Sequence, residues 1–246
     1  MSIPKIIHYC WFGGGPISAE SQKCMESWKK YCPDYKIIEW NDQNFDISTN
    51  RYAQQAYEAK KYAFVSDYVR LAVLYEYGGI YLDTDVELVR PLDELLELPG
   101  FMGFQTNNEV ATGLGFGARK GNSVVQALLR DYDALDFLKA DGSADLTPCP
   151  ERNTRVLQAL GVRKDGTRQS IAEMEIFPAE YFCPMDFYSR ELRVTPKTYS
   201  IHRYAESWKP KPSAVSRILQ RLLKKHYYTW YCPLRGRIEG RLRKRT

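Results

Sequence analysis

The sequence from Ser66 to Asp85 runs SDYVRLAVLYEYGGIYLDTD, and most of the expected architecture can be worked out from it. The first part has the apolar content of a helix, and the pair Gly78-Gly79 ends it. A short apolar run, IYL, then leads directly into two aspartates, Asp83 and Asp85. The pattern predicts a helix, a tight turn and a short strand that becomes acidic at its end.

The residues before this stretch predict a strand–helix–strand opening. Residues 3–12 are rich in β-branched and aromatic residues and predict a buried first strand. Residues 18–31 predict an amphipathic helix with Ser18 as its capping residue, and residues 35–40 predict a second strand. This order predicts a parallel, nucleotide-binding α/β sheet.

The rest of the body continues with mixed elements. Residues 53–77 predict a long helical region with an irregularity near 64–66, and residues 80–86 predict the strand that follows it. Further along, we expect strands at 101–104 and 114–118, helices at 122–138 and 151–160, and short strands in an irregular region over 161–200.

Composition limits the class of protein. The 246 residues suffice for one sizeable core, and 44% apolar with 26% charged residues excludes disordered, collagen-like and coiled-coil chains. No apolar run approaches the ~18 residues of a transmembrane helix. The first residues lack the features of a signal peptide, and the six cysteines form no C-x-x-C pair. We therefore expect reduced thiols and a cytoplasmic protein.

Charge divides the chain near residue 208. Residues 209–246 carry 12 Lys or Arg and one acid, whereas residues 1–208 carry 23 basic and 29 acidic side chains. Apolar residues between Val215 and Tyr231 share one helical face, with basic residues around it. We predict a domain over 1–208 and a basic amphipathic tail over 209–246 that binds an anionic membrane surface. A tail helix that packs on the core is the alternative.

The two aspartates after the IYL run are the candidate metal ligands. Asp83 and Asp85 are two residues apart, so on an extended segment their carboxylates point the same way. Two such carboxylates form a hard oxygen site for Mn²⁺ or Mg²⁺, with the remaining ligands supplied by substrate phosphates. A solvated turn is the alternative for a bare D-x-D. Asp67 and Arg70 share a helical face and form either a ligand-binding pair or an ordinary salt bridge.

In combination, these motifs resemble the DXD-containing sugar-transferase region of glycosyltransferase family 32. That family includes the yeast initiating mannosyltransferase of the outer chain and bacterial capsule and lipopolysaccharide enzymes. The likeness covers residues 3–93 and, more thinly, 200–208. It implies a GT-A fold, a Rossmann-like mixed sheet flanked by helices, and a retaining transfer of a hexose from a nucleotide sugar with a divalent metal, usually Mn²⁺.

The resemblance also implies residue roles. Trp11 is similar to the residue that stacks on the nucleotide base, and Tyr81 to the aromatic residue beside the donor. Asp67 and Arg70 are expected to hold the donor sugar hydroxyls. Asp83 is expected to contact the ribose and, through water, the metal, and Asp85 to ligate the metal directly.

Near the end of the body, His202 resembles a metal ligand, and Ser207 and Trp208 resemble a closing loop that reaches the diphosphate. The loop over 107–115 lies where an acceptor pocket is expected, with a plain turn as the alternative. Cys149 follows Thr147-Pro148 where relatives have Thr-Gly-Pro, so a backbone contact made by that glycine is in question.

The implied reaction adds a hexose to a glycan or lipid-linked glycan acceptor, such as capsular polysaccharide, exopolysaccharide or lipopolysaccharide, at the inner face of the membrane. UDP-sugars are favoured as donors, and GDP-mannose is the other option. Same-face attack is the working hypothesis for retention, with a covalent carboxylate intermediate as the alternative. A phosphotransferase of the D-x-D-x-T type is disfavoured because Glu87 occupies the fifth position. A module that binds nucleic acid or membrane through the tail is the non-enzymatic alternative, but the acidic body argues against nucleic acid.

Overall fold

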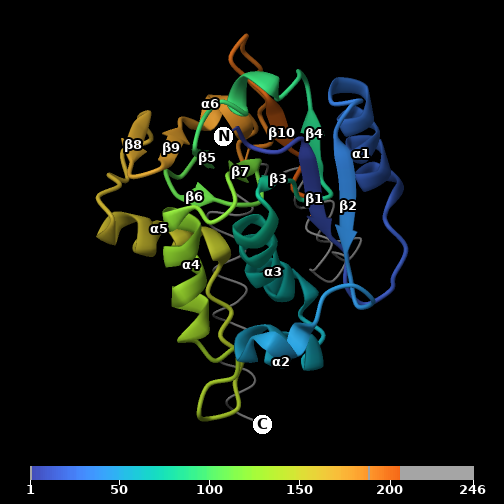
Figure 1. Cartoon of the computed structure of the whole chain (residues 1–246), viewed down its shortest axis with the longest axis vertical. Helices are drawn as coiled ribbons and strands as arrows, with labels where there is room; N and C mark the ends of the chain where they lie inside the picture. The colour runs from blue at the N-terminus through green and yellow to red at the C-terminus, as the bar shows by residue number, and fades with distance from the viewer. Residues whose placement is uncertain (1, 188, 206–246) are drawn as a thin grey trace.

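The computed structural model describes residues 2–187 and 189–205, and its main feature is a mixed sheet in the order β2-β1-β3-β7-β5-β9-β8, with β6 beside β5 (Figure 1). A separate two-stranded sheet pairs β4 with β10. The main-sheet strands are β1 (Ile6–Cys10), β2 (Lys36–Trp40), β3 (Gly79–Tyr81), β5 (Gly100–Phe104), β6 (Val110–Ala111), β7 (Phe116–Ala118), β8 (Gln169–Ile171) and β9 (Met174–Phe177). The small sheet contains β4 (Val86–Leu88) and β10 (Ser200–His202).

Helices flank this sheet. Figure 1 places α1 at the β2 edge and α4 and α5 at the opposite side, with α3 between them. The helices are α1 (Ala19–Tyr31), α2 (Arg51–Glu58), α3 (Tyr62–Tyr77), α4 (Ser123–Asp133), α5 (Cys149–Ala159) and α6 (Ala179–Phe182), and short 3-10 turns are η1 (Ile47–Thr49) and η2 (Asp93–Leu95). Mixed strand directions and flanking helices are the architecture expected of the predicted GT-A fold.

Alternating side chains of the central strands supply two cores, because successive strand residues point to opposite faces. Cys10 of β1 and Tyr81 of β3 pack in the core that includes α2, α3 and α4. Tyr9 of β1 and Ile80 of β3 pack in the other core, against Trp28 of α1. Burial on both faces explains why these strands read as continuous apolar runs.

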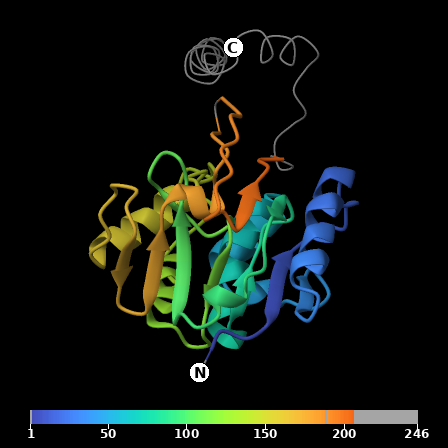
Figure 2. The same cartoon turned by 90° about the horizontal axis from the view of Figure 1, so that it is seen from above.

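The parallel part of the sheet positions the site. β1 pairs in parallel with both β2 and β3, so the carboxyl ends of these three strands meet at one edge. In Figure 2 the chain rises from the N-terminal label into β1, toward the edge above which the orange segment near residue 190 projects. Trp11, Asn41 and Asp83 follow the three strands at this edge, where ligands of open α/β sheets bind.

The expected helix over 53–77 is wrong in detail, because it is two helices. The break lies at residues 59–61 and not near 64–66. Lys60 adopts a left-handed φ of 56°, its N–H bonds the Tyr57 carbonyl, and the Lys61 N–H bonds the Ala56 carbonyl. This is a Schellman ending, which usually has glycine at the left-handed position. Because Lys60 occupies this position, the sequence contained no glycine to indicate the end of the helix.

The expected strand over 80–86 is also wrong, since β3 ends at Tyr81. A hydrogen bond from Val86 N to Asp83 O, 2.9 Å, closes a turn that redirects the chain into β4. Asp83 and Asp85 therefore lie on a turn and not on an extended segment. The helix expected over 122–138 ends at Asp133, and the one over 151–160 begins earlier, at Cys149.

Two regions named by the sequence are outside this description. Ser207, Trp208 and the basic tail over 209–246 lie beyond the described residues. Within the described part of the chain, no helix has the length and apolar character needed to cross a membrane.

Candidate active site

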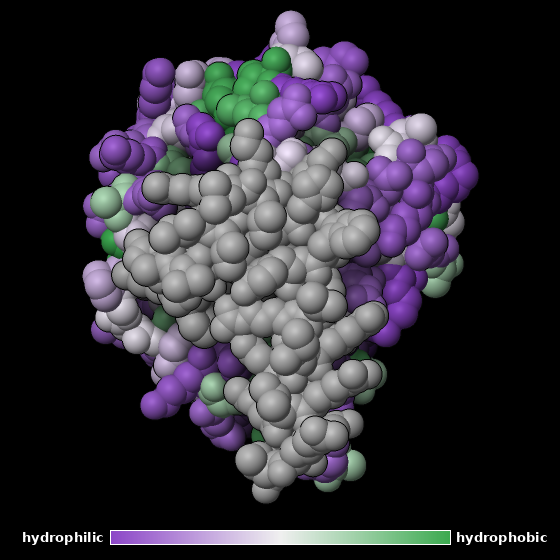
Figure 3. Space-filling view, turned by 180° about the vertical axis from the view of Figure 1, so that it is seen from behind, coloured by the Kyte–Doolittle hydropathy of each residue, from purple (hydrophilic) through white to green (hydrophobic). Residues whose placement is uncertain are grey.

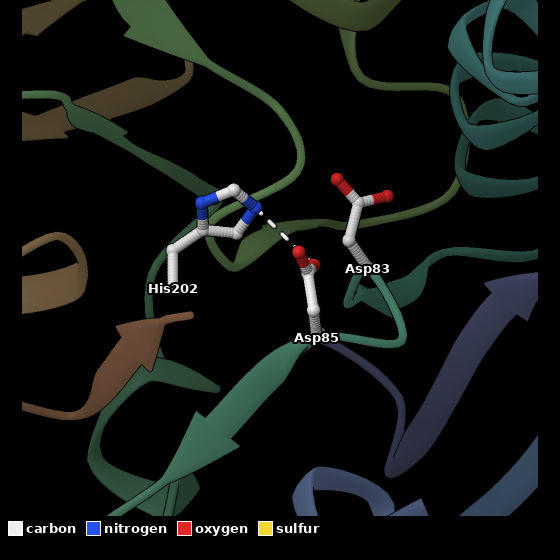
Figure 4. Close-up of side chains that lie close together, drawn as sticks. All are labelled: Asp83, Asp85 and His202. Carbon is white, nitrogen blue, oxygen red and sulfur yellow. Dashed lines mark ion pairs between the residues drawn. The ribbon is translucent and has the colours of Figure 1, made fainter. Parts of the chain in front are cut away.

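Asp83, Asp85 and His202 point toward one another at the carboxyl end of β3 (Figure 4). One ligand atom from each lies within 4.8 Å of the others. The two aspartates come from the turn between β3 and β4, and His202 comes from the end of β10. Pairing of His202 with Val86 in the β10–β4 ladder brings the histidine to the turn from more than 110 residues away in sequence.

Asp85 is held from two sides. His202 Nε2 lies 3.2 Å from Asp85 Oδ1, and the Ala205 N–H donates to Asp85 Oδ2 at 2.8 Å. Burial opposes ionisation of Asp85, but His202 and these hydrogen bonds outweigh it and lower its pKa to about 2. Burial likewise opposes protonation of His202, and Asp85 outweighs it, so the pKa of His202 is raised.

The pKa of Asp83 is shifted in the opposite direction from that of Asp85. Burial, together with repulsion from Asp85, raises the pKa of Asp83 despite the attraction of Arg70. Arg70 Nη2 lies 3.1 Å from Asp83 Oδ1, and the Tyr81 hydroxyl donates to the same oxygen at 3.0 Å. One of the two aspartates of the motif is thus fixed from the helix side and the other from the β10 side.

Arg70 connects the predicted Asp67–Arg70 pair to the aspartates of the D-x-D motif through ion pairs. Its Nη2 also lies 3.1 Å from Asp67 Oδ1, so a single guanidinium bridges Asp67 and Asp83. Arg70 is 5% exposed and Asp67 is 8% exposed, which excludes the ordinary surface salt bridge. Burial raises the pKa of Asp67 to about 6, although Arg70 opposes the rise.

Tyr81 lies under the site and not at its surface. Its ring is 1% exposed, and the Arg70 guanidinium stands 4.8 Å from the ring centroid. The hydroxyl reaches Asp83, as described above. In this structure Tyr81 supports Arg70 and Asp83, so any contact with a donor would involve those two side chains first.

Gly113 is a site residue that the sequence did not single out. Its carbonyl accepts a hydrogen bond from Asp83 N at 3.2 Å. A Cβ on Gly113 would stand 1.9 Å from Asp83 Oδ2 and 3.3 Å from Arg70 Nη1. The site therefore requires glycine here, and the small-residue run over 111–115 was the available signal.

A second unexpected group lies beneath Asp67 and Arg70, where Cys149 begins α5. The Asn153 amide donates to Thr112 Oγ1 and to Cys149 Sγ, both at 3.1 Å, and Thr112 Oγ1 lies 3.3 Å from that sulfur. Interaction with the Cys149 thiol acts to lower the pKa of Asp67, against the effect of burial. Burial raises the pKa of Cys149 to about 12, so it acts as a neutral thiol. Relatives have Thr-Gly-Pro in this segment, and this chain lacks the glycine. Here the Cys149 side chain makes the contacts with Thr112 and Asn153.

Trp11 lies at the same edge, directly after β1. It is partly exposed, its backbone N–H bonds the Trp40 carbonyl at 2.8 Å, and its indole N–H donates to Gly15 O at 2.5 Å. Its placement beside the parallel strand ends suits a ring that stacks on a planar ligand.

The donor set suits a hard divalent cation. Two carboxylates and an imidazole converge on one point, and oxygen-rich sets of this kind are typical of Mn²⁺ and Mg²⁺. His202 Nδ1 is buried and has no hydrogen-bond partner among the described residues, so the ring faces the carboxylates only through Nε2. The three residues fit a cation held between Asp83, Asp85 and His202.

The sequence region around these residues matches a known family. A sequence model described as glycosyltransferase sugar-binding region containing DXD motif matches residues 18–101, which include Asp67, Arg70, Asp83 and Asp85. Over this part of the chain the sequence is similar to the DXD-motif glycosyltransferases of family 32. The predicted family is confirmed, and the matched region ends before His202.

Curated relatives agree with this family. Inositol phosphoceramide mannosyltransferase 3 of Schizosaccharomyces pombe is 30% identical over 151 residues, which are 55% of this chain and 39% of the relative. The human alpha-1,4-N-acetylglucosaminyltransferase is 28% identical over 148 residues, 60% of this chain and 38% of the relative. The chain therefore spans less than two fifths of the length of these relatives.

Two solved structures resemble part of this chain. The PaToxG glycosyltransferase has a TM-score of 0.48 at 21% identity, over 64% of this chain and 70% of that chain. A glycosyltransferase described as involved in glycosylation of the major capsid of PBCV-1 has a TM-score of 0.47 at 12% identity, over 83% of this chain and 95% of that chain.

Proposed function

We propose that the protein is a divalent-metal-dependent, retaining glycosyltransferase that moves a hexose from a nucleotide sugar to a cell-surface glycan or lipid-linked acceptor. The observation that carries the proposal is the continuous buried chain Asp67–Arg70–Asp83, which ends beside Asp85 and His202 at the carboxyl edge of the sheet. It places groups for sugar hydroxyls next to groups for a cation.

The residues divide the work as follows. Asp85 and His202 hold the cation, with Asp83 toward the ribose, and the bound cation supplies positive charge opposite the leaving diphosphate. Asp67 accepts hydrogen bonds from sugar hydroxyls while Arg70 donates to them. Trp11 stacks on the base. Because Arg70 and its partners are already fixed, the charge that develops as the sugar leaves meets a preorganised site.

Same-face attack of the acceptor is our proposal for retention. Each described carboxylate of the site is already engaged, Asp67 and Asp83 by Arg70 and Asp85 by His202 and the Ala205 amide. A nucleophile for a covalent intermediate would have to leave one of these contacts. We therefore assign the proton of the acceptor hydroxyl to the departing phosphate.

The donor is a matter for direct test. UDP-sugars are our first choice and GDP-mannose is the second, and the relatives are named as a mannosyltransferase and an N-acetylglucosaminyltransferase. The purified full chain would be given UDP-glucose, UDP-galactose, UDP-N-acetyl sugars and GDP-mannose, with Mn²⁺ or with chelator, and nucleotide release would be measured. We expect release from one donor that chelator abolishes.

Asp85→Asn is the sharpest variant, because it removes the charge that holds the cation while keeping the side-chain shape. We expect nucleotide release to fall at least ~100-fold, and Asp141→Asn, on an exposed turn with Ser143, to leave it unchanged. Normal release by folded Asp85→Asn would contradict the metal role. No release and no nucleotide binding by calorimetry, together with salt-sensitive RNA binding, would favour the non-enzymatic alternative.

A further inference from the structure

Tyr204 lies between residues that all bind Asp85. His202 Nε2 contacts one carboxylate oxygen, Ala205 N donates to the other, and Arg203 N donates to the Asp85 carbonyl at 2.9 Å. The Tyr204 side chain contacts His202 and Cys183, and the Arg203 side chain reaches Glu87. The segment 202–205 therefore wraps around a single aspartate.

The backbone of Tyr204 makes this wrapping possible. Its φ is 52°, in the left-handed region that non-glycine residues rarely adopt. A left-handed residue reverses the local direction of the backbone, so amides on either side of it can face one anion. Here the Ala205 amide faces the Asp85 carboxylate, and the Arg203 amide faces the backbone carbonyl of the same residue. This conformation has an energetic cost for tyrosine, so it must be stabilised by contacts of the side chain.

Those contacts are present on every part of the side chain. The Tyr204 ring stands edge-on to the His202 imidazole, with 4.3 Å between centroids and 85° between planes. Its hydroxyl lies 2.9 Å from Cys183 Sγ, and Cys183 is fully buried. The Arg190 guanidinium stands 5.4 Å from the ring centroid and donates to the Arg203 carbonyl at 3.3 Å.

We infer that Tyr204 is a positioning residue of the metal centre: its anchored ring orients His202, and its left-handed backbone delivers the Ala205 amide to Asp85. The imidazole has no hydrogen bond at Nδ1 among the described residues, so the usual means of fixing a metal-binding histidine is not seen there. The edge-on contact between the Tyr204 ring and the imidazole takes the place of that hydrogen bond. Cys183, 19 residues before His202 in the sequence, is the anchor.

The inference rests on the metal-dependent site proposed above, and its test measures metal binding alone. Mn²⁺ would be titrated into the full chain at pH 7.5, and the free ion followed by its electron paramagnetic resonance signal. We expect Tyr204→Ala and Tyr204→Gly to weaken Mn²⁺ binding at least ~10-fold, the range seen when an outer-shell partner is lost. Tyr204→Phe loses the bond to Cys183 but keeps the ring contacts with His202 and Arg190, so we expect a smaller loss, of ~3-fold.

Tyr204→Gly separates positioning from folding, because glycine adopts the left-handed conformation freely. Tyr181→Ala is the matched control, since Tyr181 packs on Phe177 with 4.8 Å between centroids, in an aromatic group distinct from His202. It should leave Mn²⁺ affinity within twofold. Wild-type affinity in Tyr204→Gly, or a wild-type chain that binds no Mn²⁺, would overturn the inference. A wild-type chain that binds Mn²⁺ but transfers no sugar would contradict only the proposed function.

Discussion

Three aspartates of the site share two cationic partners. Arg70 serves Asp67 and Asp83, and His202 serves Asp85. Because carboxylates outnumber these partners, burial and mutual repulsion raise the pKa of Asp67 and of Asp83. A divalent cation relieves that excess, so the residues themselves favour cation binding before any substrate arrives.

Asp67 should leave a mark on the pH dependence of stability. Its pKa is about 6 in the folded chain against an ordinary 3.8, so between these values the folded state binds more protons than the unfolded state. Stability from this residue is therefore lost as pH rises from about 4 to about 6, by at most about 3 kcal/mol. Asp67→Asn removes this loss, and chemical denaturation at pH 4.5 and pH 7 should show the variant gaining on the wild type at the higher pH.

Asp141→Asn provides the comparison for this measurement. Hydrogen bonds from the Ser143 side chain and backbone N–H lower the pKa of Asp141, which is the reverse of the Asp67 case. Its substitution should bring no gain at pH 7. Equal behaviour of the two variants would show that Asp67 does not titrate as proposed.

Gly113→Ala tests how tightly the site is packed. The added methyl group would overlap Asp83 Oδ2, so the carboxylate must shift from the position in which it contacts Arg70. We expect kcat/KM to fall roughly 10- to 100-fold, about 1.4 to 2.7 kcal/mol of transition-state stabilisation. Gly15→Ala meets nothing within 4 Å and should stay within twofold. Full activity of Gly113→Ala would mean that the position of Asp83 is not critical.

Among the elements, α1 is tied directly to the strand that follows the turn with Asp83 and Asp85. The Trp28 indole N–H donates to Val86 O at 2.7 Å, and the Ser27 hydroxyl accepts from Leu88 N at 2.8 Å. Val86 follows Asp85, so the helix supports β4 from the face opposite His202. The N-cap that starts this helix, Ser18, accepts from Ser21 N at 3.0 Å as the sequence predicted.

Trp28→Phe should therefore destabilise the protein. Trp28 is fully buried, so the smaller phenylalanine ring leaves a void. It also leaves the Val86 carbonyl without the indole N–H that it accepts from. We expect a loss of about 2 to 3 kcal/mol, or roughly 5 to 10 °C in Tm. Trp11→Phe, at a partly exposed position, should shift Tm by about 1 °C or less. Differential scanning calorimetry would compare them, and equal Tm values would refute the role given to the Trp28 bond.

Local signals predicted the elements that rest on local chemistry. The apolar runs of β1 and β2, the Ser18 cap and the Gly78 stop of α3 are all visible in short windows. The break between α2 and α3 was misplaced because Lys60 occupies a left-handed position where glycine is usual. The length of β3 was misjudged because its end depends on the turn that leads into another sheet.

At the scale of the whole molecule, the site combines near and distant residues. The pairs Asp83–Asp85 and Asp67–Arg70 could be predicted because their spacing is short. Assignment of His202 depended on the family resemblance, since its approach to Asp85 is made by the β10–β4 ladder. Gly113, Cys149 and Tyr204 were not assigned roles, because their contacts arise only when loops meet in three dimensions.

The charge of the whole chain leads to a prediction about membranes. Residues 209–246 carry the basic excess, while the described surface in Figure 3 is mostly hydrophilic with a compact hydrophobic area near the top. We propose that the tail holds the protein on anionic lipid at the inner face of the membrane. Removal of residues 213–246 should release it from phosphatidylserine vesicles in a sedimentation assay and leave donor hydrolysis unchanged. Continued sedimentation of the truncated chain would assign the binding to another part.

The small sheet has a consequence for handling the protein. In the described residues β10 pairs only with β4, whereas β1 and β3 are held within the main sheet. Short, peripheral ladders open more readily than central ones, so the amide of Ile201 should exchange with deuterium well before that of Ile7. His202 then moves away from Asp85 while the edge formed by β1, β2 and β3 stays folded. If the proposed site holds a cation, stocks stripped by chelator during purification should take it up again on simple dialysis, with no refolding step.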